Sequence, residues 1–221
     1  MNPKITLLAL GLAITPMATA QVNLELPSSY VNTTTSGGLN TLPPNVEGSP
    51  YLTENFVQGT VFIEDEKPYP AMMRYNAYQD EIQVRGSQGL SSLFKRDYVW
   101  AVIGPHTFRI EEYERKSQTT QGYFIELNRG DLRLLKRITH VFREAEEAAS
   151  SYSQGKPPRF EEEVSYYLIK EGGPAREVRL RKKDILGFLS SKEAESYVKE
   201  NKFRLKSESE VTKLLMHLNA G

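Results

Sequence analysis

The residues that could do chemistry in this chain are few, and their spacing forms no recognisable motif. His106, His140 and His217 are the only histidines, and no two of them are three or four residues apart. A metal site needs several convergent ligands, and this spacing indicates none. The chain has no cysteine, which excludes thiol catalysis and zinc sites with thiolate ligands. We therefore predict no metal and no cofactor.

Nucleophiles and carboxylates give no stronger signal. Residues 86–89 read Gly-Ser-Gln-Gly, which lacks the G-x-S-x-G spacing of a nucleophile elbow. Glycoside hydrolysis needs two carboxylates held across a cleft. Glu111 and Glu112, or the glutamates at 161–163, are adjacent in sequence, and neighbouring residues of a strand point to opposite faces. We predict no catalytic residue, while an active site assembled from distant parts of the chain stays open.

Clustered basic side chains make a first candidate binding site. Bases close together can hold a phosphate, a carboxylate or the acidic face of a partner. The alternative is that they form the charged outer face of a strand. The candidate anion-binding or partner-binding residues are Arg176, Arg179, Arg181, Lys182 and Lys183.

Aromatic side chains make a second candidate. Tyrosines on an outward face can stack on sugars or hold an apolar ligand, although strands are rich in aromatic residues for ordinary packing reasons. Tyr166 and Tyr167 are adjacent, so we expect one in the core and the other on the surface. The candidate aromatic binding face comprises Tyr75, Tyr78, Trp100, Tyr113 and Tyr166.

The segments that must position these residues alternate between apolar and polar side chains over most of the chain. In 57–64, Val57, Val61 and Ile63 share one face, which predicts a half-buried strand. Similar strands follow at 73–75, 82–84, 98–103, 108–112, 123–127, 164–169 and 178–180. The segment 132–142 also fits a helical stripe, but its β-branched residues and the preceding turn at 128–131 favour a strand.

The last forty residues change to a helical period. Ser190 followed by Glu193, and Ser207 followed by Glu210, are typical of capping boxes, so we expect Ser190 and Ser207 to be helix caps. After the second cap the apolar residues recur at helical spacing, which predicts a helix lying on a core. Its apolar stripe is Val211, Leu214, Leu215 and Leu218.

The amino terminus indicates export. Lys4 precedes an apolar run from Ile5 to Ile14, and the small residues Ala18-Thr19-Ala20 follow. A basic start, a short apolar middle and an A-x-A end are the three parts of a secretory signal peptide. The run is too short to span a bilayer, which needs about 20 apolar residues. We expect cleavage before Gln21, and residence in the periplasm or on the outer surface of a Gram-negative cell.

Several segments carry a resemblance to a known family. Residues 48–52 read Gly-Ser-Pro-Tyr-Leu, and 74–82 read Arg-Tyr-Asn-Ala-Tyr-Gln-Asp-Glu-Ile. Residues 182–186 read Lys-Lys-Asp-Ile-Leu, and 197–202 read Tyr-Val-Lys-Glu-Asn-Lys. Together they resemble a family of uncharacterised exported proteins of Bacteroidetes-type bacteria. The resemblance implies an envelope location and no particular activity.

These patterns predict a mainly β protein of the α+β type. We expect a curved antiparallel meander or open barrel of about eight strands, followed by two or three C-terminal helices. The expected divisions are a signal peptide at 1–20, a flexible leader at 21–50, a β domain at 51–181 and a helical segment packed on the sheet at 182–221.

The function that this organisation favours is that of an exported, non-catalytic envelope protein. It would bind a protein, a glycan or an apolar partner. Nucleic acid is not an expected partner, because the chain carries 28 basic and 28 acidic residues. An open-barrel carrier of a lipid-like ligand is the second hypothesis, and a hydrolase whose site is not visible in sequence is the third.

Overall fold

The computed structural model describes residues 26–33, 42–87, 89–115, 118–148, 155–170 and 172–221. The helices are a short 3-10 turn, η1 (Ser28–Tyr30), and the α-helices α1 (Lys182–Leu189), α2 (Lys192–Glu200) and α3 (Glu208–Leu218). The strands are β1 (Val31–Thr33), β2 (Val57–Ile63), β3 (Tyr69–Asn76), β4 (Glu81–Gly86), β5 (Gly89–Leu93), β6 (Val99–Ile103), β7 (His106–Arg115), β8 (Gln118–Glu126), β9 (Arg133–Arg143), β10 (Arg159–Ile169) and β11 (Arg176–Val178).

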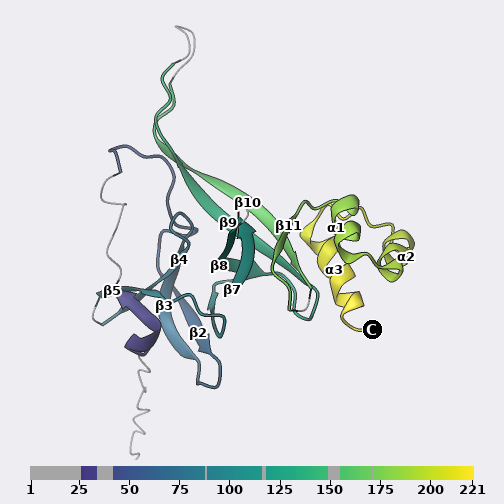
Figure 1. Cartoon of the computed structure of the whole chain (residues 1–221). Coiled ribbons are helices and arrows are strands. Elements are labelled where there is room, and N and C mark those ends of the chain that lie inside the picture. The colour runs from purple at the N-terminus through teal and green to yellow at the C-terminus, as the bar shows by residue number, and fades with distance from the viewer. Residues whose placement is uncertain (1–25, 34–41, 88, 116–117, 149–154, 171) are drawn as a thin grey trace, which may run out of the picture.

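All of these strands join one antiparallel sheet in the order β1-β5-β4-β3-β2-β6-β7-β8-β9-β10-β11. The predicted mainly β architecture with helices at the C-terminus is confirmed, but the sheet has 11 strands and not about eight. Two meanders make it up, β2 to β5 and β6 to β11, and they meet where β2 pairs with β6. The sheet curves strongly but does not close into a barrel (Figure 1).

The missed strands are short and poor in apolar residues. β1 lies inside the segment that we expected to be a flexible leader, and it pairs with β5 through Val31 and Leu93. Backbone hydrogen bonds also hold Glu47, whose N–H bonds to Pro158 O at 2.9 Å. Main-chain bonds at a sheet edge need no apolar alternation, so the sequence pattern did not reveal them. Residues 1–25, which include the signal peptide and Gln21, and residues 34–41 of the expected leader lie outside the described residues.

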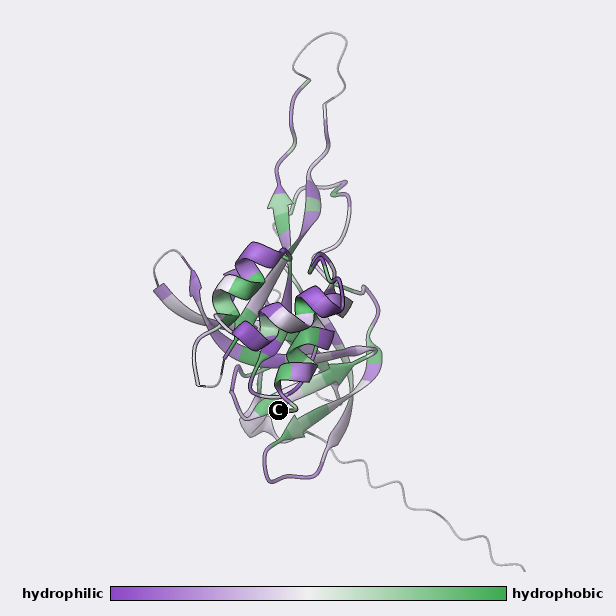
Figure 2. Cartoon of the chain, turned by 90° about the vertical axis from the view of Figure 1, so that its right-hand side faces the viewer, coloured by the Kyte–Doolittle hydropathy of each residue, from purple (hydrophilic) through white to green (hydrophobic). Residues whose placement is uncertain are grey.

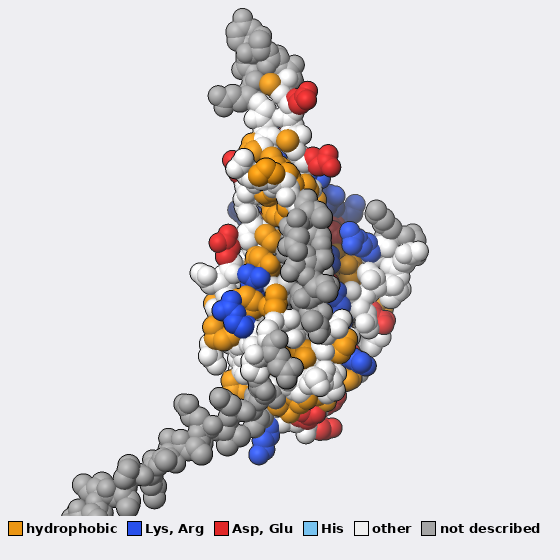
Figure 3. Space-filling model, turned by 90° about the vertical axis from the view of Figure 1, so that its left-hand side faces the viewer, with side chains coloured by type: hydrophobic (Ala, Val, Ile, Leu, Met, Phe, Trp, Pro, Cys, Tyr) orange, Lys and Arg blue, Asp and Glu red, His pale blue; other side chains and the backbone are white. Residues whose placement is uncertain are grey.

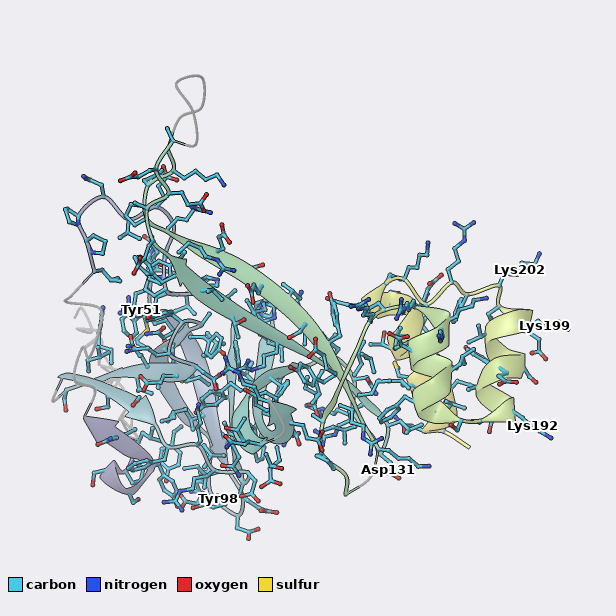
Figure 4. The ribbon with its side chains drawn as sticks, turned by 45° about the horizontal axis from the view of Figure 1, so that its top comes forward. Tyr51, Tyr98, Asp131, Lys192, Lys199 and Lys202 are labelled. Atoms are coloured by element: carbon cyan, nitrogen blue, oxygen red, sulfur yellow. The ribbon has the colours of Figure 1, made fainter. Side chains whose placement is uncertain are left out.

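The helices lie at the opposite end of the β9–β10 hairpin from its tip (Figure 1). They pack on the two strands through Leu134 of β9 and Leu168 of β10, both 0% exposed. In Figure 2 the helices face the viewer and carry both hydrophilic and hydrophobic stretches, and the buried residues among the latter include Ile185, Val198 and Leu214. In Figure 4 the side chains of Lys192, Lys199 and Lys202 lie on the side of the helices that faces away from the sheet.

The helix caps are formed by serines, with one correction to the expected positions. Ser207 caps α3, and its hydroxyl accepts the N–H of Glu210 at 3.3 Å, as predicted. The cap of α2 is Ser191 and not Ser190. Ser190 instead ends α1 in a left-handed conformation, with φ 48°, and its hydroxyl donates to Gly187 O. The two helices follow so closely that one serine ends the first and the next serine begins the second.

Candidate functional site

The sheet splits between β8 and β9. Only Ile125 and Glu126 at the end of β8 pair with β9, whereas β9 pairs with β10 along the whole length of both strands. The two hairpins, β7–β8 and β9–β10, therefore diverge from a common base. This divergence leaves backbone groups of both strands without a strand neighbour, and buried groups of that kind need other partners.

The turn between β3 and β4 enters the gap and supplies those partners. Ala77 O accepts the backbone N–H of His140 in β9 at 3.1 Å. Oδ1 of Asp80 accepts the backbone N–H of Tyr123 in β8 at 3.1 Å. The turn thus bonds to both diverging strands, and it fixes how far apart they lie.

Asp80 is the centre of this arrangement, and its side chain is 13% exposed. Besides Tyr123, its carboxylate accepts the hydroxyl of Tyr75 at 2.8 Å and the ammonium of Lys95 at 2.7 Å. Asp80 adopts φ 57°, a left-handed conformation that aspartate tolerates better than most residues. All of these contacts use the carboxylate as an acceptor, so its role is to hold the turn and the two strands together.

Arg137 of β9 lies beside Asp80 and is only 8% exposed. Its guanidinium carbon is 4.8 Å from the ring centroid of Tyr113 and 6.0 Å from that of Phe124. Its Nη2 is 3.7 Å from Oδ2 of Asp80, which is beyond hydrogen-bonding distance. Its Nε is buried and has no hydrogen-bond partner among the described residues. Burying a charged group without full pairing costs stability, so its presence here calls for a functional reason.

Gly122 keeps this corner open. A Cβ at this position would lie 3.1 Å from Oδ2 of Asp80, 3.1 Å from Cε1 of Tyr113 and 3.4 Å from Nε of Arg137. A larger residue would therefore press on all three groups at once. The glycine allows the buried arginine and the aspartate to approach β8.

A pocket of about 680 Å³ opens above Arg137, between the diverging hairpins. Its volume falls within the range of about 300–1,000 Å³ typical of small-molecule sites. The aromatic floor includes Tyr113 and Tyr167, and the turn from Ala77 to Asp80 forms one wall. Neutral hydrogen-bonding side chains on the walls are Thr120, Gln121, Thr139 and Ser165. The exposed charged side chains of the walls are the acids Glu114, Glu163 and Glu177 and the base Arg115.

The buried tyrosines around the pocket are held in the protonated form. Burial, and after it the charge of Asp80, raises the pKa of Tyr75 well above the ordinary value of 10.0 and raises the pKa of Tyr123 as well. Burial also raises the pKa of Tyr167. At neutral pH these phenols therefore carry no charge; the hydroxyl of Tyr75 donates to Asp80, whereas that of Tyr123 has no hydrogen-bond partner among the described residues.

His140 lines the pocket on the β9 side, and its side chain is 10% exposed. Its Nδ1 is 2.6 Å from Ser49 O, and because a carbonyl only accepts, Nδ1 carries the proton. Its Nε2 is 3.6 Å from Oε2 of Glu162 and has no hydrogen-bond partner among the described residues. His140 thus ties the segment before β2 to β9.

The predicted basic cluster lies apart from this pocket. All five of its residues are exposed, and none is among the described residues that line the pocket. Arg181 pairs with Asp184 at 2.9 Å, which lowers the pKa of that carboxyl. The cluster remains a candidate surface, but the structure gives it no enclosed site.

The predicted aromatic face is not a single surface. Tyr75 is 2% exposed and Tyr113 is 3% exposed, so neither presents its ring outward. Trp100 stacks on Phe62 on the opposite face of the sheet from the buried residues of β6. Figure 3 shows hydrophobic side chains reaching one side of the molecule in separate places between charged ones. Of the five residues, Tyr78 and Tyr113 both line the pocket, whereas Tyr75, Trp100 and Tyr166 do not, because their strands curve and their side chains lie on different faces.

Tyr166 and Tyr167 also differ from the expectation of one core residue and one surface residue. Tyr167 is 5% exposed and packs against Tyr113 and Phe124. Tyr166 is half-buried against the helices, and its hydroxyl donates to Glu208 of α3 at 2.8 Å. Both faces of β10 are covered here, one by the curled sheet and the other by the helices.

Sequence reasoning missed Arg137, Asp80, Lys95 and Gly122. One signal was present in the strand pattern. Arg137 shares a face of β9 with Leu135, which is 0% exposed, so a charged residue occupies an inward position. Nothing local marks Asp80, because its partner Tyr123 is 43 residues away.

A second cavity, of about 400 Å³, holds a balanced charge network. Glu126 is 6% exposed, and Arg109, Arg129 and Arg133 lie at 3.4, 3.9 and 3.8 Å from its carboxylate oxygens. Arg133 also pairs closely with Glu111. Nε of Arg109 is also buried without a hydrogen-bond partner among the described residues, but this cavity is smaller than the Arg137 pocket, which makes it the weaker candidate.

Comparison with known proteins adds no assignment. No protein-family model, curated protein or solved structure matches this chain. Within the part of the chain that the structure describes, no group of three or more histidine, aspartate or glutamate side chains could hold a metal ion. No helix in the described ranges is long and apolar enough to cross a membrane.

Proposed function

We propose that this chain is an exported, non-catalytic binding protein and that its ligand site is the Arg137 pocket. One observation carries the proposal: a 92% buried arginine, whose ion pair with Asp80 is 3.7 Å long, lines a pocket of ligand size. Buried charges in folded proteins are paired, and a ligand is the partner that would complete this one.

The other two hypotheses receive less support from the pocket. A carrier for a lipid-like molecule needs an apolar lining, whereas charged and neutral polar side chains surround this pocket. A hydrolase needs an acid or base that can reach the substrate. The carboxylate of Asp80 is engaged by Tyr75, Tyr123 and Lys95, and Nε2 of His140 has no hydrogen-bond partner among the described residues but is buried, which leaves the exposed wall acids for such a role. We therefore retain the binding function, and the amino-terminal pattern supports its placement in the cell envelope.

The proposal is tested by ligand capture with a matched control. The purified chain, and its Arg137→Met and Arg179→Met variants, are incubated with a small-molecule extract and washed, and the bound compounds are released and identified by mass spectrometry. Arg179 is exposed, belongs to the predicted basic cluster and does not line the pocket. We expect a compound enriched by the wild type and by Arg179→Met but not by Arg137→Met.

Two results would contradict the proposal. Retention that fails only in Arg179→Met would assign binding to the basic cluster. Equal retention by all three proteins would show that Arg137 has no part in it. A thermal melt of each protein accompanies the capture, so that a loss of binding is not confused with a loss of folding.

A further inference from the structure

The charges at the floor of the pocket do not cancel at close range. Lys95 and Arg137 share one carboxylate, that of Asp80. Lys95 is 2.7 Å from it and forms the ion pair, whereas Arg137 stays at 3.7 Å. A single positive charge, that of the guanidinium, is therefore left without a counter-ion at hydrogen-bond distance among the residues described.

We infer that the pocket takes a small hydroxylated monocarboxylic acid, such as a sugar acid, with its carboxylate against Arg137. This inference rests on the proposed function and names the ligand class for the same pocket. A carboxylate matches the planar guanidinium, which can donate two parallel hydrogen bonds to it. The aromatic rings of Tyr113 and Phe124 pack against the guanidinium, with centroids 4.8 and 6.0 Å from its central carbon.

The acidic side chains on the walls of the pocket favour a ligand with a single negative charge. Glu114, Glu163 and Glu177 stand on the walls, and all three are exposed. Arg143 pairs with Glu163 at 3.0 Å, whereas neither Glu114 nor Glu177 forms an ion pair with a base of the described residues. A doubly charged phosphate would gain from the guanidinium and be repelled by these acids, whereas a carboxylate meets less repulsion.

The neutral wall residues indicate hydroxyl groups on the ligand. Thr120, Gln121, Thr139 and Ser165 offer hydroxyl and amide groups that both donate and accept hydrogen bonds. A polyhydroxylated ring can use both kinds of group at once. The volume of about 680 Å³ leaves room for one or two such rings.

The inference is tested by calorimetric titration of the full chain with D-glucuronate, D-glucose and D-glucose 6-phosphate. The three sugars share the same ring and differ in the group at carbon 6, which is a carboxylate, a hydroxymethyl group or a phosphate. We expect D-glucuronate to bind about tenfold or more tightly than D-glucose, because it alone adds a singly charged partner for Arg137. We expect D-glucose 6-phosphate to bind more weakly than D-glucuronate.

Variants assign the preference to particular residues. Arg137→Met should abolish the preference for D-glucuronate over D-glucose. Gln121→Ala alters an exposed side chain of β8 and should weaken both sugars by a similar factor. Arg179→Met should leave all three titrations unchanged. If Arg137→Met does not fold, the comparison of D-glucuronate with D-glucose on the wild-type chain still decides whether the carboxylate is recognised, and Gln121→Ala still decides whether the sugars bind in this pocket.

Three outcomes would overturn the inference. Equal affinity for D-glucose and D-glucuronate would show that the charge is not recognised, and tighter binding of D-glucose 6-phosphate would assign a dianion. Absence of binding by all three sugars would exclude the hydroxylated acid as the ligand class. The capture experiment separates this failure from that of the proposed function, since an Arg137-dependent ligand of another class would still be retained.

Discussion

Oδ1 of Asp80 accepts the backbone N–H of Tyr123 at 3.1 Å, at the point where β8 has lost β9 as its neighbour. A side chain from one meander therefore replaces a missing strand contact in the other. The same carboxylate binds Lys95 and lies beside Arg137, so the contact that stabilises the split in the sheet also forms the floor of the pocket.

Removing this carboxylate should destabilise the fold strongly. Asp80→Ala leaves the Tyr123 N–H, the Tyr75 hydroxyl and Lys95 without their acceptor, and breaking a buried ion pair on one side costs about 3–5 kcal/mol. Asp80→Asn should cost less, because asparagine also adopts left-handed φ and keeps one oxygen for Tyr123. Urea unfolding measures both. Wild-type stability of Asp80→Ala would show that the turn does not hold the strands.

A methyl group added at Gly122, at the corner of the pocket, should destabilise the fold, whereas one added at Gly187 of α1 should stabilise it. Gly122→Ala places a Cβ 3.1 Å from both Asp80 and Tyr113, and we expect a loss of about 1–3 kcal/mol from the resulting overpacking. In Gly187→Ala the new Cβ meets nothing within 4 Å, and alanine in α1 should stabilise by about 0.5–1 kcal/mol. Denaturant unfolding of the two variants measures both changes in stability. An unchanged free energy of unfolding for Gly122→Ala would mean that Asp80 and Tyr113 move aside without cost.

The helical segment should depend more on its apolar stripe than on its cap. Leu215 is 0% exposed, so Leu215→Ala leaves a cavity and should cost about 2–5 kcal/mol. Ser207→Ala removes one cap hydrogen bond to Glu210 and should cost about 0.5–2 kcal/mol. The order of the two losses in urea melts is the measurement. A larger loss for Ser207→Ala would mean that the core around α3 repacks without Leu215.

The bond between β10 and α3 should weaken in alkali. Burial, and then the hydrogen bond to Glu208, raises the pKa of Tyr166 from 10.0 to about 12. A group whose pKa is raised by folding contributes its full stability below the unfolded value and loses it as pH rises to the folded value. The difference in free energy of unfolding between wild type and Tyr166→Phe should thus be constant below pH 10.0 and shrink toward about pH 12.

The control for general effects of alkali is Tyr78→Phe, whose side chain is 41% exposed and contacts the ring of Phe160. Urea melts at several pH values between 8 and 12 give both differences (the pH range is roughly that of tyrosine ionisation). If the Tyr166→Phe difference did not change with pH, the bond to Glu208 would contribute nothing to stability.

Export should produce a shortened chain. The small residues Ala18-Thr19-Ala20 predict cleavage before Gln21. The intact mass of the protein recovered from an envelope fraction should therefore correspond to a chain that begins at Gln21. Recovery of the full-length chain from the cytosol would contradict the export prediction.

The sequence by itself determined the features that depend on neighbours along the chain. Alternation predicted β2, β4 and β7, and the β-branched residues together with the preceding turn correctly favoured a strand over a helix at 132–142, which is β9. The serine at 207 predicted the start of α3. These features are readable because a strand or a helix places residues two, three or four apart on one face.

Only the tertiary structure decided which of these faces meet. The separation of β8 from β9 and the entry of the β3–β4 turn depend on contacts between distant parts of the chain. The contact between Asp80 and Tyr123, for example, joins residues 43 positions apart. Three of the five predicted aromatic residues lie apart from the pocket, whereas Arg137, Asp80 and Lys95 came together. Local patterns report which way a side chain points along its own strand, but they carry no information about curvature or about which turn lies opposite. A site built at a split in the sheet is therefore set by strand pairing over long distances in the chain.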